Sequence, residues 1–254
     1  MAVISFPLEV REVPRDARDR QVRSEEELSQ FGVRTPATLP PVVSETEVVL
    51  RAPSEVARRA LALFVVALRA ESLMSPELTV AELREKRPLA FRALTPKECV
   101  FLNNEAPDQE QITNFVWRYE ALWILAWALG LVEVLCYPSE TCDVDFLSKT
   151  FLESDEQALV EKAKLLPTET LLDALDVHFR LHWVLRQRQQ DGKPGDSNPG
   201  DSKPGDGKLG DGKLGDGEMG GSDLDPGVVL ERHYALNWLV QHEGVEWDDI
   251  KTPT

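Results

Sequence analysis

Apolar residues recur at helical spacing along most of this chain. After Pro53, the run SEVARRALALFVVALRAESL places them three and four positions apart, as on one face of an α-helix. Similar patterns predict helices over about 108–129, 155–165 and 168–190 and in the stretch after Pro226. Only residues 47–51 (EVVLR) alternate as a short strand would. The pattern therefore predicts an all-α, mainly helical fold with at most one minor short β element.

Capping residues indicate where these helices begin and end. Helix starts are expected where Ser, Thr or Asp can cap the first turn, or where Pro takes the first helical position. The expected starts are Pro53, Ser24 with Glu27, Ser75-Pro76, Thr95 with Glu98, and Asp225-Pro226. Gly32 and Gly130 are expected to end helices, because glycine readily adopts the left-handed conformation that follows a last helical turn.

Residues 191–222 differ sharply in composition from the rest of the chain. Their centre reads KPGDS-NPGDS-KPGDG-KLGDG-KLGDG, which offers no apolar face to bury and predicts a long disordered loop. The five-residue period fits neither collagen nor the known calcium-binding repeats. The remainder, residues 15–190 and 223–254, is expected to form one compact multi-helix bundle after an extended segment over residues 1–14.

Composition and charge narrow the classes of protein that fit. The 254 residues are 42% hydrophobic and 28% charged, as in an ordinary globular chain that can bury a core. The formal net charge is −16. A nucleic-acid binder or a protein of anionic membrane surfaces is therefore not expected, because both need clustered Lys and Arg. A basic protein partner would complement such a surface.

The cysteines and the apolar runs favour a soluble protein of the reducing cytoplasm. Cys99, Cys136 and Cys142 are too few for a disulfide framework and are expected to be reduced, mostly buried thiols. The most apolar stretch, residues 121–136, contains Gly130 and is shorter than the roughly 20 residues that a membrane-spanning helix needs. The first residues lack the features of a signal peptide.

Two charged residues fall inside apolar helix faces. With about 100° between successive residues, Glu120 lies at the centre of an apolar arc of the 108–129 helix, and Arg232 lies within an arc of the last helix. Buried charges persist only when they are paired, so we expect an ion pair, which is either structural or part of a ligand site. The arginines of residues 11–23 alternate with acidic residues, which predicts a solvated helix face.

Histidines on the same helices are candidates for metal binding or proton transfer. His178 and His182 lie four residues apart, and His233 and Asn237 repeat this spacing on the last helix. No HExxH motif and no third ligand accompanies them, so we expect interior, hydrogen-bonded side chains, no metal and no cofactor. A histidine beside a carboxylate would instead suit proton transfer. No nucleophile or phosphate-binding motif assigns a catalytic residue.

Several segments of the chain resemble one family. They are LRAPSEVARRALAL (50–63), LTPKECVFL (94–102), RYEALWILAWALG (118–130), DVHFRLHWVLR (176–186), DPGVVLERHYALNWLV (225–240) and WDDIKTPT (247–254). On these segments the chain is similar to the family known as domain of unknown function 4272, over roughly residues 20–190 and 223–254. The resemblance implies a compact, mainly helical bacterial domain, and it implies no activity, substrate or catalytic residue. Residues 191–222 depart from it, where a short loop is usual.

The motif residues matched in this resemblance are Arg118, Glu120, His182, Trp183, Glu231, Arg232, His233, Asn237, Trp238, Trp247 and Asp248.

Two function classes follow from these observations. The first is a non-enzymatic, acidic binding protein of the inhibitor or immunity type, which would bind a basic partner. The second is an enzyme or small-ligand sensor with a pocket near Glu120, His182, Arg232 and His233, joined by Asn237. Convergence of these side chains on one open cavity would favour the second class, whereas a closed polar cluster with an apolar patch elsewhere would favour the first.

Overall fold

The computed structural model describes residues 13–73, 79–191 and 223–254, and within these ranges it is helical without any strand. The α-helices are α1 (Arg15–Gln30), α2 (Pro53–Ser72), α3 (Val80–Lys86), α4 (Pro88–Arg92), α5 (Pro96–Asn103), α6 (Gln109–Val116), α7 (Arg118–Ala128), α8 (Val144–Glu153), α9 (Glu156–Lys162), α10 (Thr168–Asp191) and α11 (Pro226–Leu239). Two short 3-10 turns, η1 (His242–Gly244) and η2 (Trp247–Asp249), follow. The all-α prediction is confirmed.

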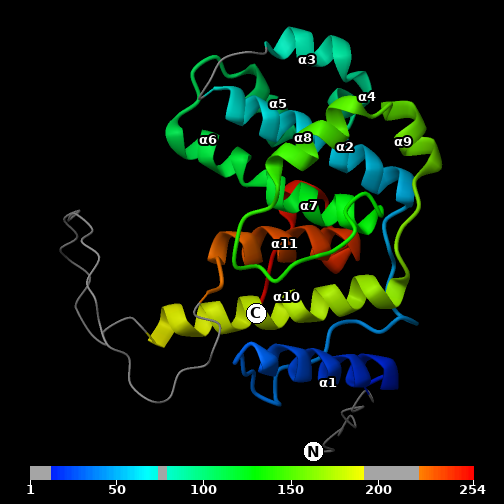
Figure 1. Ribbon diagram of the computed structural model, residues 1–254, viewed down its shortest axis with the longest axis vertical. Helices are drawn as coiled ribbons and strands as arrows, with labels where there is room; N and C mark the ends of the chain where they lie inside the picture. The colour runs from blue at the N-terminus through cyan, green and yellow to red at the C-terminus, as the bar shows by residue number, and fades with distance from the viewer. Residues whose placement is uncertain (1–12, 74–78, 192–222) are drawn as a thin grey trace, which may run out of the picture.

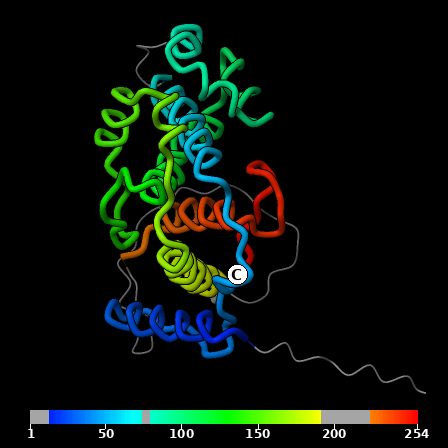
Figure 2. The backbone as a smooth tube through the Cα atoms, turned by 90° about the vertical axis from the view of Figure 1, so that its right-hand side faces the viewer, coloured from blue at the N-terminus to red at the C-terminus, as the bar shows by residue number. Residues whose placement is uncertain are grey.

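The helices form a stack. Figure 1 shows α1 at one end, followed by α10, α11 and α7, with α2 and the shorter helices α3 to α6, α8 and α9 at the other end. The side view in Figure 2 keeps the same order. Helix α2 packs on α7, α7 on α11, α11 on α10 and α10 on α1. No helix of the described ranges combines the length and the apolar character that crossing a membrane demands.

The hydrophobic core is centred on α2 and α7. Helix α2 is apolar nearly all round, and its residues from Val56 to Ala67 include an unbroken run of fully buried side chains. A helix of this kind must be surrounded by other helices. A second, smaller cluster joins α1 to α10 through Leu28, Leu181 and Val184. The fold thus contains a large core at one end and a thin apolar contact at the other.

Most predicted helix boundaries are confirmed. Thr95 and Glu98 form a capping box at the start of α5, and Asp225 accepts hydrogen bonds from the backbone of Gly227 and Val228 at the start of α11. The two glycines after α1 and α7 have positive φ values of 71° and 73°. Ser75-Pro76 lies outside the described residues, as do residues 192–222. The predicted extended segment over residues 1–14 is described only at residues 13 and 14.

The predicted cap at Ser24 is wrong. Ser24 lies inside α1, which begins at Arg15 directly after Pro14, and its side chain is buried. The helix starts earlier because the turns that precede Ser24 carry Arg20, whose guanidinium group is held by carboxylates on other elements. The tertiary contacts of the first turns outweigh a local capping signal.

The predicted long helix over 108–129 is in fact two helices. They meet at Trp117, where the N–H of Glu120 donates to the carbonyl of Trp117, a tighter turn than that of an α-helix. The Trp117 ring lies so close to Gly227 that a Cβ atom there would come within 2.6 Å of it. The close packing of this ring accompanies the change in direction.

Three further features differ from expectation. Residues 47–51 form no strand, because within the described ranges their backbone enters no ladder: Arg51 donates its N–H to the carbonyl of Leu239, and no further pairing follows. Helices α4 and α8 were not expected. Helix α8 is short and amphipathic, with Leu147 and Phe151 buried, and Asp143 caps it.

Candidate functional site

Glu120 and Arg232 form the expected ion pair. The Arg232 Nε atom donates to Glu120 Oε2 at 3.0 Å, and each residue is only 2% exposed. The other carboxylate oxygen accepts the backbone N–H of Cys142, while Arg232 also donates to the carbonyl of Cys136 at 2.9 Å. Both members of the buried pair therefore also contact backbone groups of the 131–143 segment, as a buried charge requires. The pair fastens the 131–143 segment onto α7 and α11.

The predicted interior histidines also find partners. The Nδ1 atoms of His182 and His233 lie 2.9 Å apart, so one ring donates to the other. The Nδ1 atom of His178 donates to the carbonyl of Ala174 at 2.8 Å. Burial lowers the pKa of His178 and of His182 to about 4 and holds the pKa of His233 well below its usual value. All three rings are therefore neutral at pH 7.

The candidate residues do not converge on one cavity. Glu120 and Arg232 are closed off by backbone, whereas His233 and Asn237 line an apolar cavity of about 290 Å³ beside His242. Asn237 also donates to the carbonyl of Lys251 at 3.1 Å, which ties the chain end to α11. Within the described ranges, no three His, Cys, Asp or Glu side chains group so as to hold a metal ion. A binding role for these residues stays a prediction.

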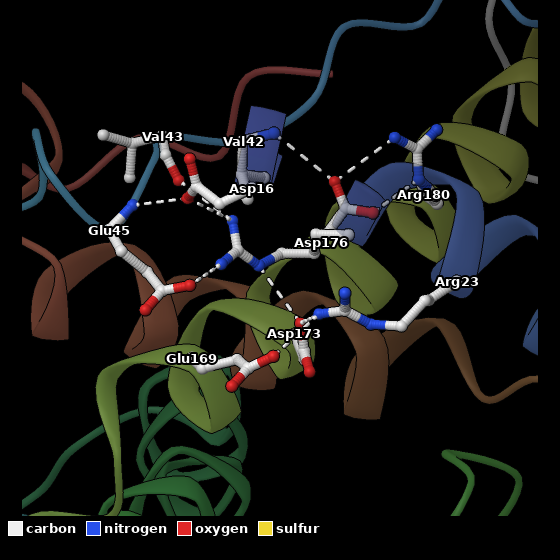
Figure 3. A network of polar contacts seen from close by, with 10 residues as sticks. Asp16, Arg23, Val42, Val43, Glu45, Glu169, Asp173, Asp176 and Arg180 are labelled. Carbon is white, nitrogen blue, oxygen red and sulfur yellow. Dashed lines mark hydrogen bonds and ion pairs between the residues drawn. The ribbon is translucent and has the colours of Figure 1, made fainter. Parts of the chain in front are cut away.

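A charge network between α1 and α10 is the main feature that sequence reasoning missed. The fully buried Arg20 guanidinium lies 3.1 Å from Asp173, 3.2 Å from Glu45 and 3.7 Å from Asp16. Figure 3 shows these three carboxylates gathered together with Arg23 and Glu169. Arg23 joins it through a 2.8 Å contact with Asp173. The expectation of a solvated arginine face is thus wrong for Arg20. The residue is buried because acidic residues from two distant segments surround it.

A second part of the network lies further along α10. Asp176 and Arg180 are both fully buried and pair at 2.7 Å, four residues apart on one helix face. Arg180 also contacts Glu25 of α1 at 3.1 Å, and Asp176 accepts the backbone N–H of Val42 at 3.4 Å. The spacing of Asp176 and Arg180 was a sequence signal for a pair, but nothing local indicated that both would be buried.

A groove lies between the end of α1, the face of α10 and residues 133–138. We call it the α1–α10 groove; its volume is about 500 Å³. Its wall includes Phe31 and Tyr137, whose rings stack with centroids 4.4 Å apart. Phe31 is 48% exposed and Val134 is 61% exposed, so large apolar side chains meet the solvent here. Such a rim of exposed apolar side chains is typical of an interaction site.

The charged side chains among the described lining residues of this groove are carboxylates. Glu27, Glu133 and Asp173 line it, and the described lining residues include neither Lys nor Arg. His178 also lines it. Because its Nδ1 atom donates to a carbonyl, its Nε2 atom is an acceptor, and this buried atom has no partner. The described lining residues therefore supply no Lys or Arg side chain that could pair with these carboxylates.

The cysteines differ in exposure. Cys142 is buried, and burial raises the pKa of its thiol. Cys99 is half-buried, and Cys136 is exposed and lines the α1–α10 groove. The expectation of mostly buried thiols is therefore wrong for Cys136, which follows the turn beside Tyr137 at the surface. The tryptophans vary too: Trp127 and Trp238 are buried, while the other three predicted core tryptophans, at 117, 123 and 183, are half-buried.

These features define an all-helical domain with a closed ion pair, paired interior histidines and an open acidic groove. The family described as Domain of unknown function (DUF4272) matches residues 20–250, and the chain belongs to this family. No curated protein and no solved structure gives a significant match.

Proposed function

We propose that this protein is a binding protein whose α1–α10 groove takes a basic, partly apolar segment of a partner protein. The observation that carries this proposal is the composition of the groove. It joins the exposed Phe31 ring and the half-buried Tyr137 ring to three carboxylates, and neither Lys nor Arg is among its described lining residues. A partner that supplies both apolar anchors and hydrogen-bond donors would complement it.

The apolar part of the groove would provide most of the affinity. Aromatic and aliphatic side chains that fill a pocket dominate the energetics of most interfaces. The stacked Phe31 and Tyr137 rings, with Val134 beside them, offer such a surface for a Leu, Phe or Trp of the partner. Two flat rings that already stack lose little further freedom when the partner binds.

The acidic part would provide specificity and speed of association. Glu27 and Glu133 are exposed, and Lys or Arg side chains of a partner would pair with their carboxylates. Asp173 is already held by two arginines and would contribute less. The net charge of −16 would steer a basic partner toward the protein, an effect that weakens as salt is added.

The alternative of an enzyme or small-ligand sensor near Glu120, His182, Arg232 and His233 has less support. The two charged side chains pair with each other and with backbone groups, and both are buried. A group that is to bind a substrate needs an open side, which this pair does not offer.

Cross-linking from Cys136 tests the proposal, because this exposed thiol lies in the groove wall. A benzophenone attached to Cys136, with Cys99 changed to Ser, is activated in a lysate of the native host, and the joined peptides are sequenced. We expect one dominant partner segment that is rich in Lys or Arg and contains an apolar anchor. The double variant Glu27→Lys, Glu133→Lys should abolish the product.

The matched control carries the same probe on α8, away from the groove. It combines Glu153→Cys, at an exposed position, with Cys99→Ser and Cys136→Ser. The groove product should be absent there. Equal products at both sites, acidic partner segments, or a product that survives the double variant would contradict the proposed function.

A further inference from the structure

A second cavity lies at the opposite side of the core from the α1–α10 groove. It has a volume of about 670 Å³, within the range of small-molecule sites. Three segments that are distant in sequence line it: residues 55–59 of α2, residues 93–97 at the start of α5, and residues 246–249 with Trp238. Figure 2 shows the C-terminal segment, in red, beside the start of α2. We call it the tryptophan cavity.

Two indole rings form the apolar wall of this cavity. Trp238 and Trp247 meet edge to face with centroids 5.3 Å apart. The Arg51 guanidinium covers the Trp238 ring at 4.9 Å, and that of Arg59 covers the Trp247 ring at 5.0 Å. Cation–π contacts of this kind fix the rings in place. A flat apolar group would find a rigid surface here, with Leu94 beside it.

The wall also contains two donors that have no acceptor. The Nε1 atom of Trp238 and the Nε atom of Arg59 are buried and have no hydrogen-bond partner among the described residues, and both residues are at least nine-tenths buried. The other nitrogens of Arg59 are engaged by the carboxylate of Glu98 and the carbonyl of Ala93. An unmade hydrogen bond of a buried donor is unfavourable. The part of the chain that the structure describes provides no acceptor for these two donors.

Three of the four carboxylates that line the cavity already have a donor within the chain. Glu55 and Glu246 are occupied by Arg51, at 2.7 and 3.4 Å. Asp248 accepts the backbone N–H of Lys97, whose Nζ atom donates to the Asp248 carbonyl.

Arg58 lines the cavity and can donate further hydrogen bonds. Among the described residues, its guanidinium group is hydrogen-bonded to Ser54, on its own helix turn, at 3.4 Å and to no carboxylate. The exposed Asp249 at the rim would repel a second negative charge. The cavity therefore suits a single carboxylate better than a phosphate.

We propose that the tryptophan cavity binds a small monocarboxylate with a flat apolar body. The carboxylate would accept from Trp238 Nε1 and pair with Arg58, while the apolar body would lie against Trp247. This site is separate from the α1–α10 groove and shares none of its lining residues. The protein would then hold a small ligand at one side and a partner segment at the other.

The test uses phenylacetate and indole-3-acetate as acid probes, with phenethylamine and tryptamine as matched amines, in isothermal titration calorimetry of the full chain. We expect saturable binding of the acids and none of the amines. Trp238→Phe keeps the aromatic body and removes the donor, and it should weaken acid binding about tenfold, the effect of one hydrogen bond to a charged group. Arg58→Gln should weaken it to a similar degree.

Trp123→Phe is the matched control. The Nε1 atom of Trp123 is also buried without a partner, but this ring packs on Phe146 of α8, away from the cavity. The control should bind the acids as the wild type does. Absence of acid binding at millimolar concentration, equal binding of amines, or equal losses in Trp238→Phe and Trp123→Phe would overturn the proposal. Circular dichroism of each variant shows that it is folded.

Discussion

The two ends of the molecule are held together by opposite means. Helices α2 and α7 meet through fully buried aliphatic and aromatic side chains, among them Phe64, Leu122 and Leu125. Helices α1 and α10 meet mainly through arginines and carboxylates, with Arg20 at the centre. The burial of apolar side chains stabilises the fold but does not by itself fix how two helices are oriented. Ion pairs contribute little net free energy, but they form only when the two helices that carry them are correctly placed. The charged end therefore fixes the position of α1, which forms one wall of the proposed groove.

The Glu120–Arg232 pair is a charged contact within the apolar end, and its loss should have the largest effect. Arg232→Met would leave the Glu120 carboxylate buried without its partner, at a cost of about 3–5 kcal/mol in the free energy of unfolding. Glu120→Gln should also be destabilising, and the double variant should lose much less than the sum of both. Urea denaturation of the four proteins measures this. Additive losses would show that the two charges do not depend on each other.

A cavity in the apolar core should have the next largest effect. Leu122→Ala removes a fully buried side chain between α7 and α2 and should cost about 2–5 kcal/mol. Because no charge is involved, the loss should be the same in low and in high salt. If the loss of unfolding free energy in Leu122→Ala changed strongly with salt concentration, the contrast between an apolar end and a charged end would be contradicted.

Acid should destabilise the fold through the interior histidines. The pKa values of His178 and His182 are near 4 in the folded protein and 6.5 when the ring is unperturbed, so the unfolded chain binds more protons between these values. The free energy of unfolding should therefore be at its full value above pH 6.5 and fall as the pH drops toward 4. Urea denaturation across this pH range checks the slope. The double variant His178→Gln, His182→Gln should show a smaller slope, and an unchanged slope would refute the assignment.

The α1–α10 network should show the smallest effect and the strongest dependence on salt. Asp173→Asn removes a partner of Arg20 and Arg23, but Glu45, Asp16 and Glu169 remain. The expected cost is about 1 kcal/mol at low ionic strength and less at high ionic strength, because Asp173 is partly exposed and its contacts are screened. Thermal melts at two salt concentrations measure it. Glu153→Gln, at an exposed position of α8, is the matched control and should be nearly neutral.

The same comparison explains what could be predicted from sequence. Apolar periodicity and capping residues are local, so α2, α5 and α11 were predicted with their starting residues. Glu120 and Arg232 could be paired because each stood alone inside an apolar arc. Arg20 could not be placed, because its acidic partners come from residues 45 and 173 and only the tertiary structure brings them together.

The break at Trp117 and the groove were beyond prediction for related reasons. No glycine or proline marks the end of α6, and the Trp117 ring at the break packs against Gly227 of α11, a contact that only the tertiary structure creates. The groove brings Phe31, which follows α1, against Tyr137, which follows α7. Helices α2 to α7 separate the two residues along the chain, so no spacing in the sequence links them. The acidic character of the groove agrees with the net negative charge of the chain. That charge favours a basic partner, but it does not show where on the protein such a partner would bind.

The contact between Trp117 and Gly227 constrains how this protein can vary between species. A methyl group at position 227 would overlap the indole ring, whose nearest atom lies 2.6 Å from the position of such a Cβ. A relative that acquires alanine there would need a smaller side chain at position 117 to keep α7 and α11 in place. The two positions should therefore change together across lineages, so that aligned relatives pair a large ring with glycine or a small residue with a larger one.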